Sequence, residues 1–405
     1  MPEHIHRPLE AVLLTPREKH FFFAYYDKLQ FDPTDRWVLA QKADFLDRPP
    51  RPDDAITVGT IDLRDNHRWE PLERTTGWCW QQGCMLQWLP GDGRRVIHNV
   101  RTADGYGALI HDLDRNRRQE IGRPIYCVRP DAREAMGNDP NRVAWTRPGY
   151  GYVGFDDPNA SIVAPVDAGL WRIDLERNEF ELLHSIRDAA HRDPSADPED
   201  ASAPHWFNHL LYNTDGSRVI FLHRWKSHDG RTYTRMYTCD PDGGNLHQVS
   251  DAAAPDGYNA SHFWWRDAQT IIMWGGDHEG HGAYRLLRDQ DREIEQLCPA
   301  LLPQDGHMTY GPPGPLGAER WILSDTYPDV QTGERTLLLY RPDLELRIDI
   351  GSFHAGNLDG EIRCDLHPRW SRSGRWITID SVHEGFRGVY LLEIGPLLQE
   401  FGGAG

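Results

Sequence analysis

Four histidines recur at the same place in a repeated pattern, each three residues before an aromatic residue. They are His209, His262, His307 and His367. Neutral imidazole is the commonest nitrogen ligand for transition metals in proteins. If the repeat brings at least three of these rings to one point, they can hold a divalent ion, with zinc or manganese expected. An ion with an open coordination position would act as a Lewis acid. The alternative is that the rings hydrogen-bond neighbouring segments or water.

Arginine and tryptophan occur close together in two basic clusters, at residues 142–147 (RVAWTR) and 223–226 (HRWK). A guanidinium binds a carboxylate through two parallel hydrogen bonds, and an indole offers a flat face for a sugar ring. The clusters therefore indicate a site for a sugar that carries a carboxylate. The alternative is a solvated loop with a half-buried tryptophan. Trp206 lies near a strand entry, where it belongs either to the core or to a cleft.

The elements that must position these residues form seven copies of strand, turn, strand, turn, strand. The first strands are residues 28–31, 85–88, 125–128, 209–212, 262–265, 307–310 and 367–370. Seven such units predict an all-β fold, a seven-bladed β-propeller that forms a single closed domain over residues 1–405. The first strand of each unit lies innermost in a propeller, so the four histidines are expected to face its channel. Two parallel-sheet domains are the competing interpretation, but the alternating helical patterns they need are missing.

Two segments depart from the regular repeat. The last copy has three obvious strands, and a strand near residues 11–15 (AVLLT) is expected to complete it and close the ring. Copies three and four begin at residues 125 and 209, which predicts a long insertion at about 145–205 with one helical turn near 183–190. Long insertions are often functional, although a plain surface loop fits the sequence equally well.

The composition excludes several classes of protein. Lys plus Arg is 44 and Asp plus Glu is 62, so the formal net charge is −18. Such a chain is a poor binder of nucleic acid through a broad basic face, and no apolar run is long enough to span a membrane. The first residues lack a signal-peptide pattern and the six cysteines make no CxxC pair, so we expect a cytoplasmic protein with reduced thiols. The GxSxG and P-loop motifs are absent, and no GxGxxG follows a strand.

Several longer motifs resemble the propeller polysaccharide lyases, most closely the ulvan-lyase-like branch and more distantly the oligogalacturonate lyases. The motifs touch all seven copies and are residues 22–28 (FFAYYDK), 80–88 (WQQGCMLQW), 147–152 (RPGYGY), 221–225 (FLHRW), 305–307 (DGH) and 363–370 (RCDLHPRW). The resemblance implies cleavage of uronic-acid glycosides by β-elimination. In that reaction the sugar carboxylate is neutralised, a base removes the C5 proton and an acid protonates the leaving oxygen.

The resemblance also implies roles for particular residues. The ulvan-lyase pattern implies Tyr126 for proton transfer and Arg142 for the carboxylate, whereas the oligogalacturonate-lyase pattern implies a metal at the four histidines. Asp305, Cys364 and Asp365, next to two of those histidines, are candidate further ligands or residues that orient the rings. The residues assigned to substrate binding are Gln81, Gln82, Arg147, Tyr150, Trp206, His223 and Arg224.

One departure from the family pattern keeps other functions open. Gln81 and Gln82 stand where the resemblance implies a catalytic histidine, and glutamine cannot act as a base. Either Tyr126 makes both proton transfers, another histidine substitutes, or the activity differs. The leading hypothesis is a metal-binding lyase that acts on an acidic oligosaccharide. The alternatives are a non-catalytic propeller that binds a sugar or a protein, and another carbohydrate-active enzyme on the same scaffold.

Overall fold

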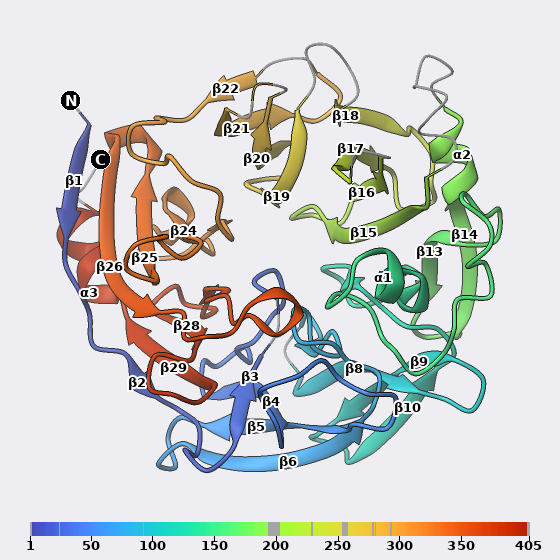
Figure 1. Cartoon of the computed structure of the whole chain (residues 1–405). Helices are drawn as coiled ribbons and strands as arrows, with labels where there is room; N and C mark the ends of the chain where they lie inside the picture. Colours follow the sequence, from blue (N-terminus) through green and yellow to red (C-terminus); the bar gives the residue numbers. More distant parts are fainter. Residues whose placement is uncertain are drawn as a thin grey trace.

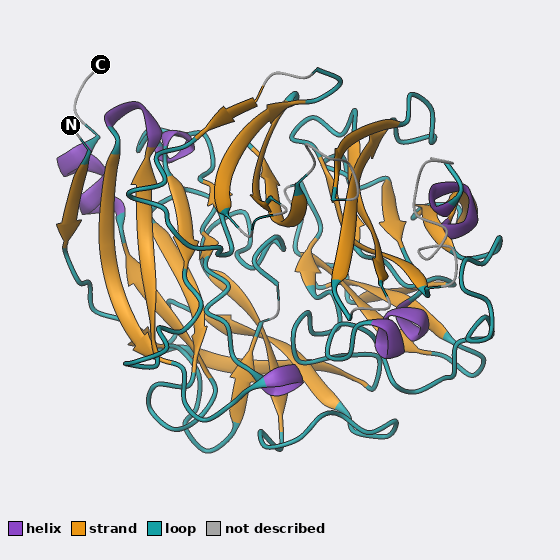
Figure 2. Ribbon diagram, turned by 45° about the horizontal axis from the view of Figure 1, so that its top comes forward, coloured by secondary structure: helices purple, strands orange, loops and turns teal. Residues whose placement is uncertain are grey.

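Seven small sheets stand in a ring around a central axis in the computed structural model (Figure 1). The structure describes residues 2–23, 25–91, 93–192, 203–227, 230–252, 258–277, 279, 281–291 and 294–402. Within these residues the consecutive strands of each blade pair antiparallel, and helices are few and short (Figure 2). This confirms the predicted seven-bladed β-propeller and excludes the interpretation as two parallel-sheet domains.

The blades follow one another along the chain, and each begins with its innermost strand. Blades 1 and 2 contain β3 (His20–Phe22), β4 (Trp37–Ala43), β5 (Ile56–Asp62), β6 (Arg68–Thr75), β7 (Gln87–Trp88), β8 (Arg95–Arg101), β9 (Tyr106–Asp112) and β10 (Arg117–Ile121). Blades 3 and 4 contain β11 (Cys127–Val128), β12 (Glu134–Gly137), β13 (Gly169–Asp174), β14 (Glu179–Ser185), β15 (His205–Tyr212), β16 (Val219–Lys226), β17 (Thr232–Cys239) and β18 (His247–Asp251).

The last three blades continue the same order. Blade 5 contains β19 (Asn259–Trp265), β20 (Thr270–Gly276), β21 (Gly282–Arg288) and β22 (Ile294–Gln296). Blades 6 and 7 contain β23 (Thr309–Tyr310), β24 (Ile322–Asp325), β25 (Glu334–Arg341), β26 (Leu346–His354), β27 (Arg369–Trp370), β28 (Trp376–Ser381) and β29 (Gly388–Glu393). The helices are α1 (Pro140–Thr146), α2 (Ile186–Ala190) and α3 (Gly395–Phe401), with 3-10 turns η2 (Ala318–Arg320), η3 (Pro342–Leu344) and η4 (Gly360–Ile362).

The N-terminal segment closes the ring with two strands. β2 (Val12–Leu13) pairs antiparallel with β29 and is the outermost strand of blade 7, within the segment 11–15 where the sequence places a closing strand. β1 (Glu3–His6) pairs parallel with β26, which gives blade 6 a fifth strand that the repeat does not predict. The two ends of the described chain consequently lie on the same side of the ring (Figure 1).

Aspartates fix the turns that punctuate the repeat. In blade 1 the Oδ1 atom of Asp32 accepts hydrogen bonds from the backbone nitrogens of Arg36 and Trp37, at 2.8 and 2.7 Å. In blade 5 the Oδ1 atom of Asp267 accepts from the backbone nitrogens of Gln269 and Thr270, at 2.9 and 2.8 Å. Such turns satisfy backbone groups that leave the sheet ladder, so the acidic turns of the sequence repeat have a structural cause.

The predicted insertion at 145–205 is divided by regular structure. Residues 169–174 and 179–185 form β13 and β14 of the third blade, so most of the irregular part that is described lies at residues 147–168. Ser185 and Asp188 form a capping box at the start of α2, which confirms the predicted helical turn. Residues 193–202 of the predicted insertion lie outside the described residues.

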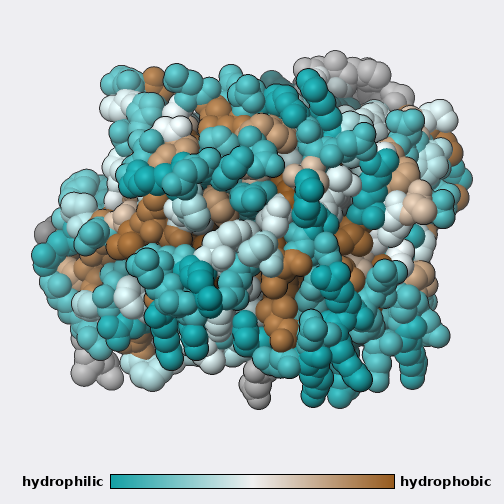
Figure 3. Space-filling model, turned by 90° about the horizontal axis from the view of Figure 1, so that it is seen from below, coloured by the Kyte–Doolittle hydropathy of each residue, from teal (hydrophilic) through white to brown (hydrophobic). Residues whose placement is uncertain are grey.

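Buried apolar residues pack between neighbouring blades. Buried clusters join blades 2 to 4, blades 6 and 7, and blades 1 and 2. The flank seen in Figure 3 is mostly hydrophilic with small separate apolar patches. All six cysteines are free. Among the helices that the structure describes, none is long and apolar enough to cross a membrane.

Candidate functional site

Three of the four predicted histidines form a continuous cluster at the centre of the ring. The ring centroids of His262 and His307 are 4.4 Å apart, and those of His307 and His367 are 4.3 Å apart. All three side chains are buried. Blades 5, 6 and 7 each supply one ring, as the shared register of the histidines predicts.

Two of these imidazole rings are hydrogen-bonded to carboxylates through Nδ1. The Nδ1 atom of His262 lies 2.9 Å from Oδ1 of Asp305, and Nδ1 of His307 lies 2.9 Å from Oδ1 of Asp325. Asp325 also accepts hydrogen bonds from the backbone nitrogens of His307 and His367, at 2.8 and 3.2 Å. A carboxylate at Nδ1 places the ring proton there and leaves Nε2 with its lone pair, which is how metal-ligating histidines are oriented.

Unpartnered nitrogens and a carboxylate meet inside this cluster. The buried Nε2 atoms of His307 and His367 have no hydrogen-bond partner among the described residues. One ligand atom from each of His307, His367 and Asp365 can be chosen so that all three lie within 4.8 Å of one another. Arg335 and Arg363 bind the Asp365 carboxylate at 3.0 and 2.8 Å and fix its position.

The backbone is left-handed at the same register of three blades. His209 has φ 52°, His367 has φ 42°, and Met85, which occupies this register in blade 2, has φ 56°. Such values are uncommon outside glycine, asparagine and aspartate, and they persist only where the surrounding structure imposes them. Each of these residues lies three positions before the aromatic residue of its repeat, which is Tyr212, Trp370 or Trp88.

His209 is set apart from the other three histidines by two tyrosines. The Tyr26 ring lies within 6.5 Å of all four imidazole rings, and the Tyr25 ring lies 5.0 Å from His209 and 5.1 Å from His367. Both tyrosines are 2% exposed. They fill the space that the histidines surround, so the four rings do not converge on one point.

The carboxylate of Asp27 belongs to the His209 side of the channel. Its Oδ2 atom lies 3.5 Å from His209 Nε2 and 2.8 Å from Lys28 Nζ. The Lys28 ammonium also lies over the Tyr126 ring, 4.4 Å from its centroid. A buried charge needs such a partner, and here the Asp27–Lys28 pair lies between His209 and Tyr126.

Tyr126 and Gln82 are joined by a short hydrogen bond, in which Gln82 Nε2 donates to Tyr126 Oη at 2.6 Å. The turn that aims Gln82 inward is closed by two backbone hydrogen bonds between Cys79 and Gly83. Gly83 has φ +55°, and a Cβ there would collide with the Gln41 amide, so this turn needs glycine. The structure thus brings two predicted site residues, Tyr126 and Gln82, next to the His209 side of the channel.

The side chain of Gln81 is used in hydrogen bonds to the backbone of another segment. Its Nε2 atom donates to the carbonyls of Glu361 and Arg363 at 2.9 and 3.1 Å, and the residue is buried. The bonds connect blade 2 to the segment before His367. Gln81 therefore helps to place the Arg363–His367 segment.

Arg142 is not placed to bind a substrate carboxylate, contrary to the sequence-based assignment. Its side chain is 1% exposed, and its nitrogens donate to five internal acceptors. These are Asp157 Oδ2 and the carbonyls of His205, Asn159, Ile162 and Val163. A guanidinium has five N–H donors, and all are used here. Arg142 stabilises the loop that follows α1, because the backbone there offers carbonyls that the sheets do not pair.

Arg147 and Tyr150 lie beside the cluster, after the end of α1. The Arg147 guanidinium is 4.0 Å from the Tyr150 ring centroid, and Arg363 Nη2 donates to Tyr150 Oη at 2.6 Å. Within the described residues, Arg147 makes no ion pair with a carboxylate. Trp206 and Tyr150 pack in one buried cluster with Tyr25 and Tyr26, so Trp206 belongs to the wall of the channel.

His223 and Arg224 lie in blade 4, apart from this group. His223 Nε2 is 2.9 Å from His205 Nδ1, deep in the sheet. Arg224 Nη2 lies 3.4 Å from the carbonyls of Ala260 and Ser261, immediately before His262. Arg224 therefore contacts the strand that carries a cluster histidine, whereas His223 is a core residue.

Burial sets the protonation of the central groups. It lowers the pKa of His209 to about 4, with Asp27 opposing the shift, and it lowers the pKa of His367 well below its ordinary value. Burial would lower the pKa of His307 as well, but the Asp325 carboxylate leaves that pKa raised. Burial, and after it the charge of Asp27, raise the pKa of Tyr126 well above its ordinary value.

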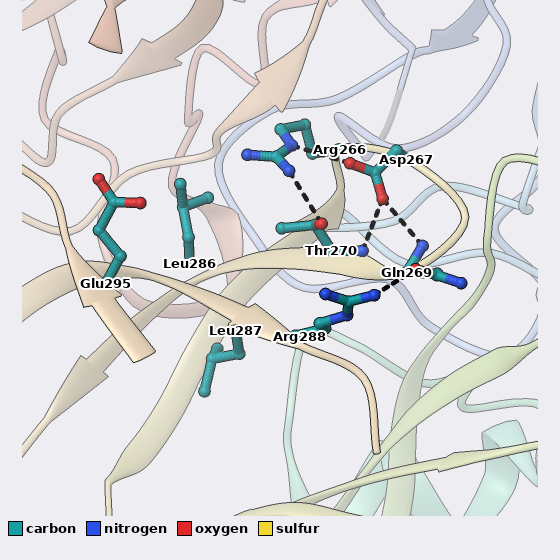
Figure 4. Close-up of a pocket in the computed structure, with 8 residues that line it drawn as sticks. All are labelled: Arg266, Asp267, Gln269, Thr270, Leu286, Leu287, Arg288 and Glu295. Carbon is teal, nitrogen blue, oxygen red and sulfur yellow. Dashed lines mark hydrogen bonds and ion pairs between the residues drawn. The ribbon is translucent and has the colours of Figure 1, made fainter. Parts of the chain in front are cut away.

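A pocket of about 410 Å³ lies elsewhere, on blade 5. Figure 4 shows its lining, in which Arg266 and Arg288 bind Asp267 and Gln269. None of the residues that the sequence assigns to the site lines this pocket, so it does not alter the choice of the central cluster.

Sequence reasoning missed Tyr25, Tyr26, Asp325 and Arg363 as individual members of the site. Thr309 pairs with Leu323 in antiparallel strands, and two residues further along this pairing sets Asp325 opposite His307. An aspartate at the end of the second strand of this blade could therefore have been predicted to contact the histidine. The tyrosines and Arg363 stand within motifs 22–28 and 363–370, but nothing in their spacing shows that they reach the channel.

The comparisons with known proteins rest on structure alone. No protein-family model matches the chain, and no curated protein matches its sequence. The fold is similar to that of an oligogalacturonate lyase from Vibrio parahaemolyticus, with a TM-score of 0.65, 14% identity, and coverage of 95% of this chain and 94% of the other. An oligogalacturonate lyase in complex with manganese gives a TM-score of 0.67 at 15% identity, over 98% of this chain and 100% of the other. At these identities the similarity shows a shared fold: this chain has the propeller architecture of the oligogalacturonate lyases.

Proposed function

We propose that the protein is a metal-dependent lyase that cleaves uronic-acid-containing oligosaccharides by β-elimination. The observation that carries the proposal is the pair of unpartnered Nε2 atoms of His307 and His367, buried beside the Asp365 carboxylate. The fold that the chain shares with oligogalacturonate lyases, one of them in complex with manganese, supports the same reaction class.

The residues present fit a divalent ion. His307, His367 and Asp365 would hold it, and His262, whose ring is 4.4 Å from His307, would be the fourth ligand. Burying two nitrogen lone pairs that accept no hydrogen bond costs free energy. A cation bound by both nitrogens would offset this cost. A divalent ion there supplies positive charge that stabilises the carboxylate as C5 loses its proton. Imidazole and carboxylate ligands suit manganese and zinc, and we propose manganese as the first ion to test.

Arg147, in place of Arg142, would bind the sugar carboxylate, the role that the family resemblance implied for Arg142. Arg147 is half-buried next to the cluster, and its guanidinium has an aromatic neighbour but no carboxylate within the described part of the chain. A sugar carboxylate would complete its hydrogen bonding. Arg363 is already bound to Asp365 and Tyr150, so it orients these two side chains.

Two residues on the other side of the channel suit the proton transfers. His209, with its lowered pKa, is neutral near pH 7 and can accept the C5 proton, while Asp27 lies near its Nε2 atom and would stabilise the imidazolium. Tyr126, with its raised pKa, keeps its proton and can donate it to the leaving oxygen. His209 is thus the histidine that substitutes for the one missing at Gln81 and Gln82.

The alternative function, a propeller that binds a sugar without cleaving it, is favoured by one observation. Tyr25 and Tyr26 fill the space among the histidines and are almost completely buried. Cleavage requires these rings to make room for the sugar, whereas a sugar that binds at the half-buried Arg147 would leave them in place.

One assay distinguishes the two functions. The purified protein is incubated with ulvan, pectic, glucuronan and glycosaminoglycan oligosaccharides, with and without Mn²⁺, and the ultraviolet absorbance of the unsaturated product is followed. The lyase proposal predicts a rising absorbance on at least one substrate that EDTA abolishes and Mn²⁺ restores. An unchanged absorbance on every substrate, together with binding that calorimetry can measure, would reject the lyase function and support the sugar-binding function.

A matched pair of variants tests the assignment of the metal. His307→Gln with His367→Gln should lose both bound metal and turnover. His223→Gln is the control, because His223 is buried in the propeller like His307 and His367 but lies outside the histidine cluster. Equal metal content in both proteins would contradict the assignment.

A further inference from the structure

A second group of imidazole and carboxylate side chains lies on the flank of blade 6, outside the channel. His4 Nε2 is 2.8 Å from Asp349 Oδ2, and His6 Nδ1 is 3.6 Å from the same oxygen. One ligand atom from each residue can be chosen so that all three lie within 4.8 Å of one another. The two imidazole centroids are 4.6 Å apart.

The pairing of β1 with β26 produces this arrangement. His4 and His6 are two residues apart in β1, so their side chains leave the same face of the strand. The parallel register places His6 beside Asp349 and His4 beside Arg347. The three ligands thus come together only when β1 is docked on the ring.

The carboxylate is held in place before any ion arrives. Asp349 is 11% exposed, and its Oδ1 atom accepts a hydrogen bond from Arg347 Nε at 2.7 Å. Arg347 is itself fixed by the carbonyl of Leu301, at 2.8 Å. This leaves Oδ2 directed at the two imidazoles, whose side chains are 40% and 72% exposed and open to an ion from solvent.

We propose that His4, His6 and Asp349 bind a zinc-type divalent ion that fastens the N-terminal strand to blade 6. Two imidazoles, one carboxylate and open positions for water form a donor set that suits zinc. β1 needs such an anchor, because it has four residues and only Ile5 packs against the core. An ion that binds only the docked strand stabilises docking by mass action.

Hydrogen exchange and zinc stoichiometry on the full chain test this proposal, which is independent of the proposed lyase activity. At a zinc concentration about 100 times Kd, opening of β1 should be suppressed about 100-fold. The amides of Arg7 and Leu9, which donate to β26 carbonyls, should exchange correspondingly more slowly with zinc than with EDTA. The variant His4→Gln with His6→Gln should lose this zinc effect and one equivalent of bound zinc.

The control is His247→Gln, which removes a partly buried histidine on the outer strand of blade 4. It should keep the zinc stoichiometry and the protection of β1. The proposal is overturned if the double variant binds as much zinc as the wild type, or if zinc leaves exchange in the wild-type β1 unchanged. Zinc that binds at the central cluster adds equally to the zinc content of both variants. The difference in zinc content between them therefore still reports on the site at β1.

Discussion

Asp325 Oδ1 lies 2.9 Å from His307 Nδ1, and the same carboxylate accepts the backbone N–H of His367 from the next blade. One side chain at the end of β24 therefore fixes a histidine ring in blade 6 and the start of the left-handed turn in blade 7. It sets the tautomer of His307, so that the bare Nε2 atom faces His367 and Asp365.

Replacing Asp325 by Asn should weaken metal binding by about 10- to 100-fold, because the amide is a poorer acceptor for the imidazole N–H. The measurement is a calorimetric titration of the metal-free protein with Mn²⁺. Asp329→Asn is the control, since that carboxylate accepts backbone hydrogen bonds in an exposed turn of the same blade. Identical dissociation constants for the two variants would show that Asp325 does not orient a ligand.

Tyr126→Phe should abolish turnover and cost about 1–3 kcal/mol of stability, because Gln82 loses its buried acceptor. Tyr152→Phe is the matched control. Tyr152 is equally buried, and its Oη atom accepts a hydrogen bond from Asn99 at 2.9 Å, but it lies outside the histidine cluster. Steady-state kinetics and thermal unfolding separate the two effects. Turnover that survives in Tyr126→Phe would remove this residue from the mechanism.

Arg142→Met and Arg147→Met should lose different properties. The first variant should lose stability, and the second should lose affinity for the substrate. Arg142 is paired with Asp157 at 3.0 Å inside the protein, so its loss should destabilise the fold by about 3–5 kcal/mol. Loss of Arg147 should leave the melting temperature unchanged and raise KM about 10- to 100-fold, the equivalent of one charged hydrogen-bonded contact. Denaturant unfolding and KM, measured on both variants, check this. A normal KM in a folded Arg147→Met protein would exclude Arg147 as the carboxylate-binding residue.

Acid should destabilise the protein in part through His98, which is buried in blade 2 away from the histidine cluster. Burial lowers the pKa of His98 to about 4. Because the unfolded chain binds this proton near pH 6.5 and the folded chain only near 4, stability is lost as the pH falls between these values. The contribution is up to about 3 kcal/mol. Unfolding free energies at pH 7 and pH 4 should differ less for His98→Gln than for the wild type, and an equal difference would contradict the assignment.

The repeat pattern predicted the fold because seven copies of strand, turn and strand recur without the helical patterns that a parallel-sheet or helical-repeat fold needs. The same register correctly placed three histidines together. It could not show that Tyr25 and Tyr26 would separate His209 from them, because those tyrosines come from a loop outside the register. Nor could it show that Arg142 is internal, since an arginine that binds loop carbonyls and one that binds a sugar look alike in sequence. β1 was missed because four residues reading EHIH carry no apolar alternation.

Ring closure by the outermost strands has a consequence for synthesis. β1 and β2 are made before every other described strand, whereas their partners, β26 and β29, are made with the last two blades. Until then the earlier blades can form only an open arc, whose first and last sheets expose unpaired surfaces. Joining strands so distant in the chain is slow, and the waiting arc offers its edges to other nascent chains. Completion of the circle, rather than formation of any single blade, is therefore the step at which this protein is most exposed to aggregation.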